Sequence, residues 1–316
     1  MGLGSPGLFR FGIIAAALML PTLGQCQAFE FSGSIQTAFV SGTLKGKLKN
    51  GERFYRTHVS ASKGNWTAKA SYWNYVFCDW HELDETNIQY STDQYTATIG
   101  RFLMPVGQAN WDDQWYSSFV FVPLIEGHVY GGRKVLERTS TGAQFDLIAG
   151  ANNYNLSLTN SDPQVNQPIA SRLDRTSFRW KTYKSGVQFG LSALADSATL
   201  GKKEQLLVAD IRYTVPHLIV RGELLGYQSP TQRNSGFFVD ANFRPRNWQD
   251  LTLSLRFEQL SSHLPTETKQ EAWTLAAKAR LPFESTLLIN YTGGPDMGRL
   301  TLGGGWSFGL NKTFRF

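Results

Sequence analysis

The last eleven residues, 306–316, alternate between apolar and polar side chains and read W-S-F-G-L-N-K-T-F-R-F. Successive side chains of a β-strand point to opposite faces, so Trp306, Phe308 and Leu310 would cover one face of such a strand. The run then finishes on two aromatic residues, Phe314 and Phe316. An apolar outer face with an aromatic residue at the interface is typical of a strand in a lipid-embedded β-barrel. We therefore interpret this segment as a closing strand, with Phe314 and Phe316 as its assembly signal.

Segments of the same period recur from residue 29 onward, and no long segment follows a helical period. Residues 251–258 show the pattern well, because Leu253, Leu255 and Phe257 alternate with polar and charged residues. The sequence predicts an all-β protein, a transmembrane antiparallel up-and-down β-barrel of about sixteen strands. We expect these strands at 30–41, 52–62, 65–76, 84–91, 94–102, 137–148, 152–160, 175–183, 186–195, 203–214, 217–228, 236–244, 250–261, 271–281, 285–292 and 303–316.

The links between these strands alternate in length. Every second link is tight, as at Lys184-Ser185 and Val215-Pro216, whereas the others are long and polar. Membrane barrels show this asymmetry, with short periplasmic turns and longer external loops. Residues 103–136 form the longest link, and long links in compact proteins are usually functional. We expect this third long loop to fold into the lumen and narrow it.

The first 28 residues predict a secretory signal peptide, which leaves residues 29–316 as the barrel domain. An apolar run at 11–20 precedes a small-residue stretch, with Cys26 and Ala28 at the −3 and −1 positions of a cleavage site. A lipoprotein signal that acylates Cys26 is the alternative. An export signal together with a lipid-facing barrel indicates the bacterial outer membrane. Only Cys78 would remain after cleavage, so no internal disulfide is expected.

The charge balance is basic, with 31 Lys and Arg residues against 25 Asp and Glu residues. The polar face of the predicted strands would line the pore, and its acidic residues are Asp146, Asp210, Glu223, Asp240 and Glu258. The basic residues on that face are Arg56, Lys69, Arg138, Arg175, Arg179, Lys181, Arg212, Arg221, Arg256, Lys278 and Arg280. This excess favours anions in the lumen. The alternative is that many of these charges pair across neighbouring strands and rigidify the wall.

The longest loop contains its own charged residues, which predict a pore constriction. They are Asp112, Asp113 and Glu126, with Arg133 and Lys134 at the exit of the loop. If Asp112 and Asp113 face the basic wall, they create a transverse field that orients dipolar solutes. The alternative is an acid pair that is solvated or that anchors the loop.

The segment Ile99-Gly100-Arg101-Phe102-Leu103-Met104-Pro105-Val106-Gly107 leads into this loop. It resembles the phosphate-selective porin O and P type and its relatives, within the sixteen-stranded porins of Gram-negative bacteria. In those proteins a Gly-Arg/Lys-aromatic run and Pro-x-Gly open the third loop. The resemblance implies a homotrimer, whereas the basic ladder of the phosphate-specific members cannot be placed here residue by residue. Strict alternation would aim Arg101 at lipid, unless a bulge at Gly100 turns it.

The sequence thus predicts a non-enzymatic outer-membrane porin, a water-filled channel for passive diffusion of small hydrophilic solutes and ions. Its expected partners are the lipid bilayer, lipopolysaccharide and two further copies of the chain. The alternatives are a channel specific for phosphate or a sugar, an adhesin, or an outer-membrane enzyme. His58 and Ser60 share the polar face, which argues against a lipase, and Cys78 with His81 is too sparse for a metal site. We expect no cofactor, and an export signal argues against nucleic acid as a partner.

Overall fold

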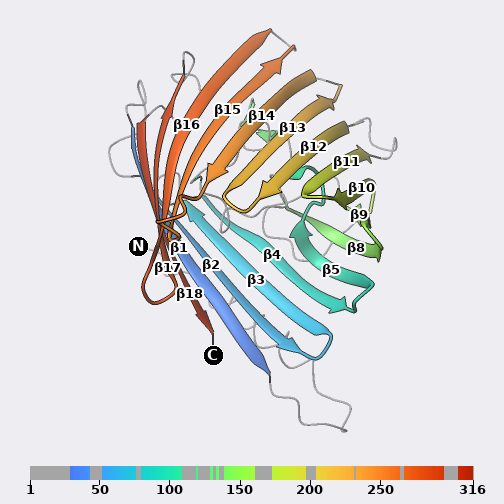
Figure 1. Ribbon diagram of the computed structural model, residues 1–316. Helices are drawn as coiled ribbons and strands as arrows, with labels where there is room; N and C mark the ends of the chain where they lie inside the picture. Colours follow the sequence, from blue (N-terminus) through green and yellow to red (C-terminus); the bar gives the residue numbers. More distant parts are fainter. Residues whose placement is uncertain are drawn as a thin grey trace, which may run out of the picture.

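The computed structural model describes residues 29–42, 52–75, 80–108, 119, 129–130, 133–134, 139–160, 173–196, 204–230, 233–263, 267–294 and 305–315. Within these residues, sixteen antiparallel strands form one closed barrel, as predicted (Figure 1). The strands of its first half are β1 (Glu30–Gly42), β2 (Glu52–Lys63), β3 (Trp66–Tyr75), β4 (Trp80–Ser91), β5 (Tyr95–Leu103), β8 (Thr139–Ala149), β9 (Asn152–Thr159) and β10 (Arg175–Lys184). Those of its second half are β11 (Val187–Asp196), β12 (Gln205–Val215), β13 (Leu218–Gln228), β14 (Arg233–Phe243), β15 (Leu251–Ser262), β16 (Thr268–Leu281), β17 (Ser285–Gly293) and β18 (Gly305–Arg315).

The barrel closes where β1 pairs with β18. Their ladder runs from Ser32 opposite Arg315 to Gly42 opposite Gly305, so the first and last strands leave no free edge between them. Two further short strands, β6 (Val129–Tyr130) and β7 (Arg133–Lys134), pair only with each other in the link between β5 and β8. Among the described residues, no helix has the length and apolar character needed to cross a membrane. The predicted signal peptide lies outside the described residues.

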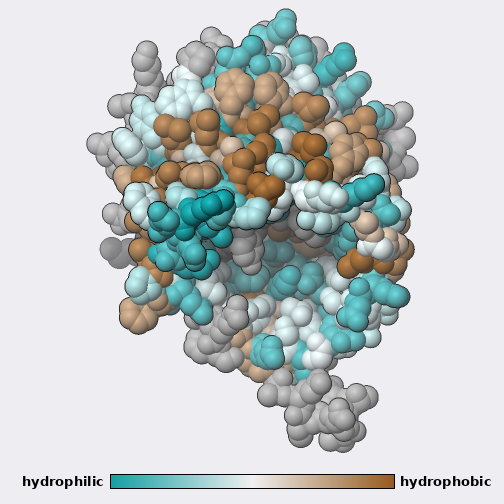
Figure 2. All heavy atoms as spheres, in the orientation of Figure 1, coloured by the Kyte–Doolittle hydropathy of each residue, from teal (hydrophilic) through white to brown (hydrophobic). Residues whose placement is uncertain are grey.

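The outer face of the barrel is apolar, as the alternation predicts. On β15, Leu255 is 50% exposed whereas the adjacent Arg256 is 3% exposed, and Leu253 and Phe257 are exposed like Leu255. Figure 2 shows apolar residues gathered in a band over β12–β15, above a hollow lined by hydrophilic residues. A continuous apolar surface of this kind would be unstable against water and is suited to lipid.

Short turns close one end of the barrel. Between β10 and β11, Ser185 has φ 51° and Gly186 has φ 82°. Two consecutive positive φ values define the type I′ turn, which matches the twist of paired strands and explains a two-residue link. The other tight links predicted from the sequence also lie at this end, which we call the short-turn end. The opposite end carries the long links, and we call it the long-loop end.

Three strands begin earlier than the sequence predicts. β4 begins at Trp80 rather than residue 84, β14 at Arg233 rather than 236, and β16 at Thr268 rather than 271. All three differences lie at the long-loop end, where polar residues such as Lys269 pair in the ladder opposite Ser261. Backbone pairing continues beyond the part of the strand that alternates, and this explains why the apolar pattern underestimates strand length.

Candidate pore lining

Contacts made across the barrel identify its inner face. The backbone N–H of Gly107 donates to Ser192 Oγ on β11 at 3.2 Å, and that of Gln108 donates to Glu223 Oε2 on β13 at 2.5 Å. Residues 107 and 108 follow β5, which is separated from β13 in the barrel by β8 to β12. Such contacts can form only inside the barrel, so Ser192 and Glu223 point into it. We call the enclosed space the lumen.

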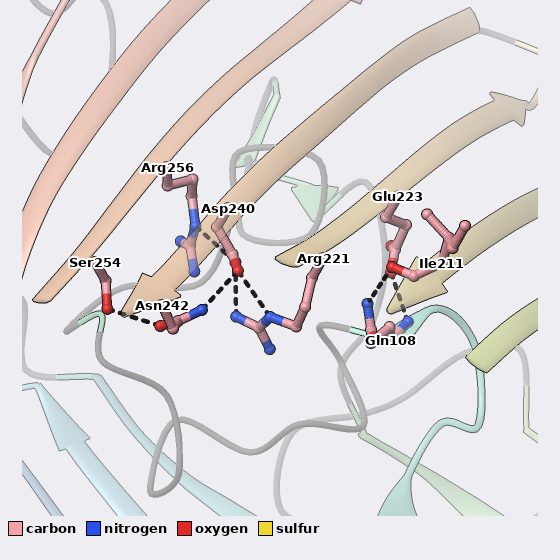
Figure 3. Close-up of polar contacts among 8 residues, drawn as sticks. All are labelled: Gln108, Ile211, Arg221, Glu223, Asp240, Asn242, Ser254 and Arg256. Carbon is pink, nitrogen blue, oxygen red and sulfur yellow. Dashed lines mark hydrogen bonds and ion pairs between the residues drawn. The ribbon is translucent and has the colours of Figure 1, made fainter. Parts of the chain in front are cut away.

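A network centred on Asp240 lies on this inner face (Figure 3). Arg221 on β13 donates to Asp240 on β14 from Nε at 2.9 Å and from its terminal nitrogen at 2.6 Å. Arg256 on β15 places Nε 3.8 Å from the same carboxylate, and Asn242 donates to it at 2.9 Å. The three charged residues are direct neighbours across β13, β14 and β15. This arrangement fixes two guanidinium groups around one buried carboxylate.

Arg256 also contacts two aromatic rings. Its guanidinium carbon lies 3.8 Å from the ring centre of Phe119, in the link after β5, and 5.7 Å from that of Phe238. Phe238 is fully buried. A cation held over an aromatic face is stabilised, more strongly when both groups are removed from water. This contact ties one residue of the long link to the barrel wall.

A second ion pair lies closer to β10. A terminal nitrogen of Arg179 is 2.8 Å from Asp210 Oδ2 on β12, and the other terminal nitrogen donates to Ser192 Oγ at 2.9 Å. Gly190 on the intervening strand leaves room for the pair, because a Cβ there would lie 2.5 Å from Asp210 Oδ2. Ser192 accepts from both Arg179 and the Gly107 N–H, so the same hydroxyl joins the wall to the segment after β5.

A third cluster lies at the long-loop end. Arg175, the first residue of β10, donates from Nε to Asp196 Oδ1 at 2.7 Å and from a terminal nitrogen to Glu204 Oε2 at 2.9 Å. Together, the three clusters show that Arg175, Arg179, Arg221 and Arg256 all lie close to carboxylates. Pairing across strands, one of the two interpretations of the sequence, therefore occurs at these positions.

The adjoining strands β8 and β9 are polar inside, and Asp146 is their one charged residue. Asp146 on β8 accepts from Asn155 Nδ2 at 2.5 Å and from Gln144 Nε2 at 2.8 Å, so its described partners are amides. Further along, Ser157 and Ser177 share a hydrogen bond of 2.5 Å between their hydroxyl oxygens. The inner face thus carries arginine–carboxylate pairs over β10–β15 and, directly beside them, amides and hydroxyls from β8 to the Ser177 position of β10.

Part of the inner face is apolar, which the sequence analysis missed. Leu206, Leu225 and Leu260 project inward near the long-loop end and pack with Met104 and Val106, which follow β5. Both Met104 and Val106 are fully buried. The covering segment explains how leucines on the inner parity escape water. A signal was present in the sequence, because 206–208 and 224–225 are apolar on both faces.

The segment after β5 begins at a distorted backbone. Gly100 has φ +122°, and a Cβ there would lie 2.3 Å from the Thr86 carbonyl oxygen. Ile99 is 70% exposed on the outer face, but Arg101, two residues later, is only 3% exposed. Strict alternation would leave Arg101 exposed on the outside, so the structure departs from it directly after Gly100.

The predicted site residues divide into those the structure describes and those it does not. Arg175, Arg179, Arg221 and Arg256 are buried, Lys69, Lys181, Arg212 and Lys278 are half-buried, and Arg280 is exposed near the short-turn end. The following lie outside the described residues, in whole or in their side chains: Arg56, Asp112, Asp113, Glu126, Arg133, Lys134, Arg138, Phe314 and Phe316. Among the described residues, no group of three or more His, Cys, Asp or Glu is arranged to hold a metal ion.

Comparison with solved structures identifies the same architecture in outer-membrane proteins. The chain is similar to Salmonella typhi OmpF, solved with daunomycin, at a TM-score of 0.66 and 10% identity, covering 91% of this chain and 97% of that one. It is similar to the anion-selective porin of Comamonas acidovorans at a TM-score of 0.63 and 11% identity, covering 92% and 99%. It is also similar to the trimer form of Vibrio cholerae OmpT, at a TM-score of 0.60 and 10% identity, covering 92% of this chain and 99% of that one.

No protein-family model matches the sequence, and no curated protein matches it significantly. At 10–11% identity these comparisons establish the fold, and the activity is argued from the lining of the barrel. The chain therefore has the closed β-barrel fold of the outer-membrane porins.

Proposed function

We propose that this protein is a porin of the bacterial outer membrane that lets small hydrophilic solutes diffuse through a water-filled lumen. One observation carries the proposal: a closed barrel is apolar outside, polar inside and crossed by the segment that follows β5. The hollow in Figure 2 is lined by hydrophilic residues, as an aqueous passage requires. The likeness to solved structures described as porins supports it.

The charge distribution supports a mild preference for anions. Asp240 is shared by two arginines, Arg221 and Arg256, so these three residues carry an excess of positive charge. Arg280 adds an exposed cation near the short-turn end. A planar bilayer with a salt gradient tests this preference. An anion-preferring pore makes the dilute side negative, whereas a positive dilute side would refute it.

The long link after β5 acts, in this proposal, as the constriction. Its described part is held to the wall at Ser192, Glu223 and Arg256, which supports a path through the lumen. Asp112 and Asp113 would then face the arginine wall, with Glu126, Arg133 and Lys134 completing the charged rim of the loop.

Replacing Asp112 and Asp113 together by asparagine tests this role. Because two negative charges leave the constriction, we expect the reversal potential in a salt gradient to move further toward anions. Stepwise conductance should stay of similar size, since side-chain volume is preserved. An unchanged reversal potential would show that the two acids lie away from the ion path.

The same proposal includes a homotrimer. Ala61, Ala68 and Ala143 share one outward row of the sheet with Ile99, so β2, β3 and β8 each place one small side chain in this row. Small side chains allow two barrels to approach closely. The Vibrio cholerae protein is described as a trimer. Native mass spectrometry in detergent would contradict this part if only monomers were found.

Relationship to the phosphate-selective porin O and P type is a further part of the proposal. The segment 99–107 that resembles those porins lies where the chain leaves the wall, with positive φ at Gly100 and Gly107. A Cβ at Gly107 would lie 2.6 Å from Glu223 Oε1, which explains the glycine in Pro-x-Gly at this point. The likeness concerns loop anchoring and carries no claim of phosphate specificity.

A further inference from the structure

A depression of about 640 Å³ lies on the outer face of β10–β15, and we call it the outer groove. Phe178, Leu207, Leu224 and Phe237 form its walls, while Ala193 and Gly226 lie along its floor. The wall residues are prominent, because Leu207 is 68% exposed and Leu224 is 62% exposed. The groove is therefore bounded by large apolar side chains that project from the sheet.

Gly226 leaves part of the floor open. Gly226 lies between Leu207 on β12 and Ser235 on β14 in the ladder. A Cβ at Gly226 would have no heavy atom within 4 Å, and its φ is ordinary for any residue. A larger side chain would therefore fill the groove without straining the barrel, although the chain has kept the space empty. A flexible apolar chain running along the surface would fit this shape.

One end of the groove is polar and positively charged. Ser235 lines the groove, and Arg233 lies two residues away on the same face of β14, about 7 Å along the strand. Arg233 is exposed and is the first residue of β14, so it lies at the long-loop end. Lys269, nearby on β16, is already held by Glu271 at 2.5 Å. An apolar groove that ends beside an exposed guanidinium complements an acyl chain whose headgroup carries a phosphate.

We propose that the outer groove holds one acyl chain of a phosphorylated glycolipid of the lipid A type, with a phosphate of that lipid at Arg233. This inference rests on the proposed function, because it places the long-loop end in the outer leaflet of the outer membrane. The site lies on the lipid-facing wall, over β10–β15, away from the alanine row on β2, β3 and β8. It therefore leaves the proposed trimer face free.

Native mass spectrometry of the full-length barrel in detergent, titrated with lipid A, tests this site. The wild type should retain one tightly bound lipid A per chain. Gly226→Leu should weaken that binding at least tenfold, because leucine occupies the floor. Arg233→Gln should weaken lipid A binding by a similar factor and leave binding of phosphatidylethanolamine unchanged. Ala277→Leu on the outer face of β16 and Arg246→Gln at the short-turn end are matched controls that should bind as the wild type does.

Three outcomes would overturn the inference. Unchanged affinity of Gly226→Leu would show that the lipid binds elsewhere, and unchanged affinity of Arg233→Gln would remove the phosphate contact. If Gly226→Leu lost the oligomer peaks of the mass spectrum and kept its bound lipid, the groove would be a contact with a second copy of the chain. The lipid readout is made in detergent and does not require conduction, so failure of the wild type to conduct would contradict the proposed function alone. Far-ultraviolet circular dichroism confirms that each variant has folded.

Discussion

Gly100→Val is expected to lower the free energy of unfolding by about 3 kcal/mol or more, which is enough to impair refolding of the barrel in detergent. At φ +122° a β-branched residue is strained, and its Cβ would lie 2.3 Å from the Thr86 carbonyl oxygen on β4. Both effects act at the end of β5, where this strand pairs with β4 just before the long link begins. The measurement is urea-induced unfolding in detergent micelles, followed by tryptophan fluorescence.

Gly226→Val is the control for this prediction. It makes the same change in a strand of the same barrel, at a position with ordinary φ and open space around the added atom. We expect its unfolding free energy to change by less than about 1 kcal/mol. Equal destabilisation by the two variants would show that the backbone at Gly100 carries no special constraint.

Asp240→Asn is expected to cost about 3–5 kcal/mol of stability and to increase the preference for anions. The carboxylate is buried and offsets part of the positive charge of Arg221 and Arg256, so its loss leaves guanidinium groups close together without that charge. An added positive charge in the lumen should make the dilute side of a salt gradient more negative. Unfolding in urea and the reversal potential in a planar bilayer measure the two effects on the same preparation.

Asp146→Asn provides a matched comparison for Asp240→Asn. Asp146 accepts hydrogen bonds from the amides of Asn155 and Gln144. Removing its charge therefore leaves none of its described partners as an unpaired cation. We expect a cost of about 1–2 kcal/mol, the usual range for hydrogen bonds to a charged group. If the two variants were equally stable, the charge pairing around Asp240 would contribute nothing beyond ordinary hydrogen bonding.

Alternation between two faces made the barrel predictable from the sequence. In a membrane both faces obey a strict requirement, because the outer one meets lipid and the inner one meets water. Leu253, Leu255 and Phe257 therefore predict a strand and identify its lipid-facing side. The lengths of the links indicate how the strands are connected. Outside the bilayer the outer face of a strand need not be apolar. The polar extensions of β4, β14 and β16 therefore do not show the alternation of apolar and polar residues.

The interior could be predicted only in part. Parity places Arg221, Asp240 and Arg256 on one face, but neighbours in the ladder become known only when the register is known. Phe238 and Leu206 lie on the inner face of the barrel. They are buried from water because residues after β5 cover them, which is a consequence of tertiary structure. Arg101 is buried where strict alternation would expose it, and the glycine that precedes it was the signal in the sequence.

Single-channel recording of the purified protein in a planar lipid bilayer tests the central claim most directly. The account predicts stepwise increases of conductance whose size rises in proportion to salt concentration, as expected for ions crossing a water-filled lumen. It also predicts that neutral solutes small enough to enter will reduce each step. A folded, bilayer-inserted barrel that produces no conductance steps at any salt concentration would contradict it.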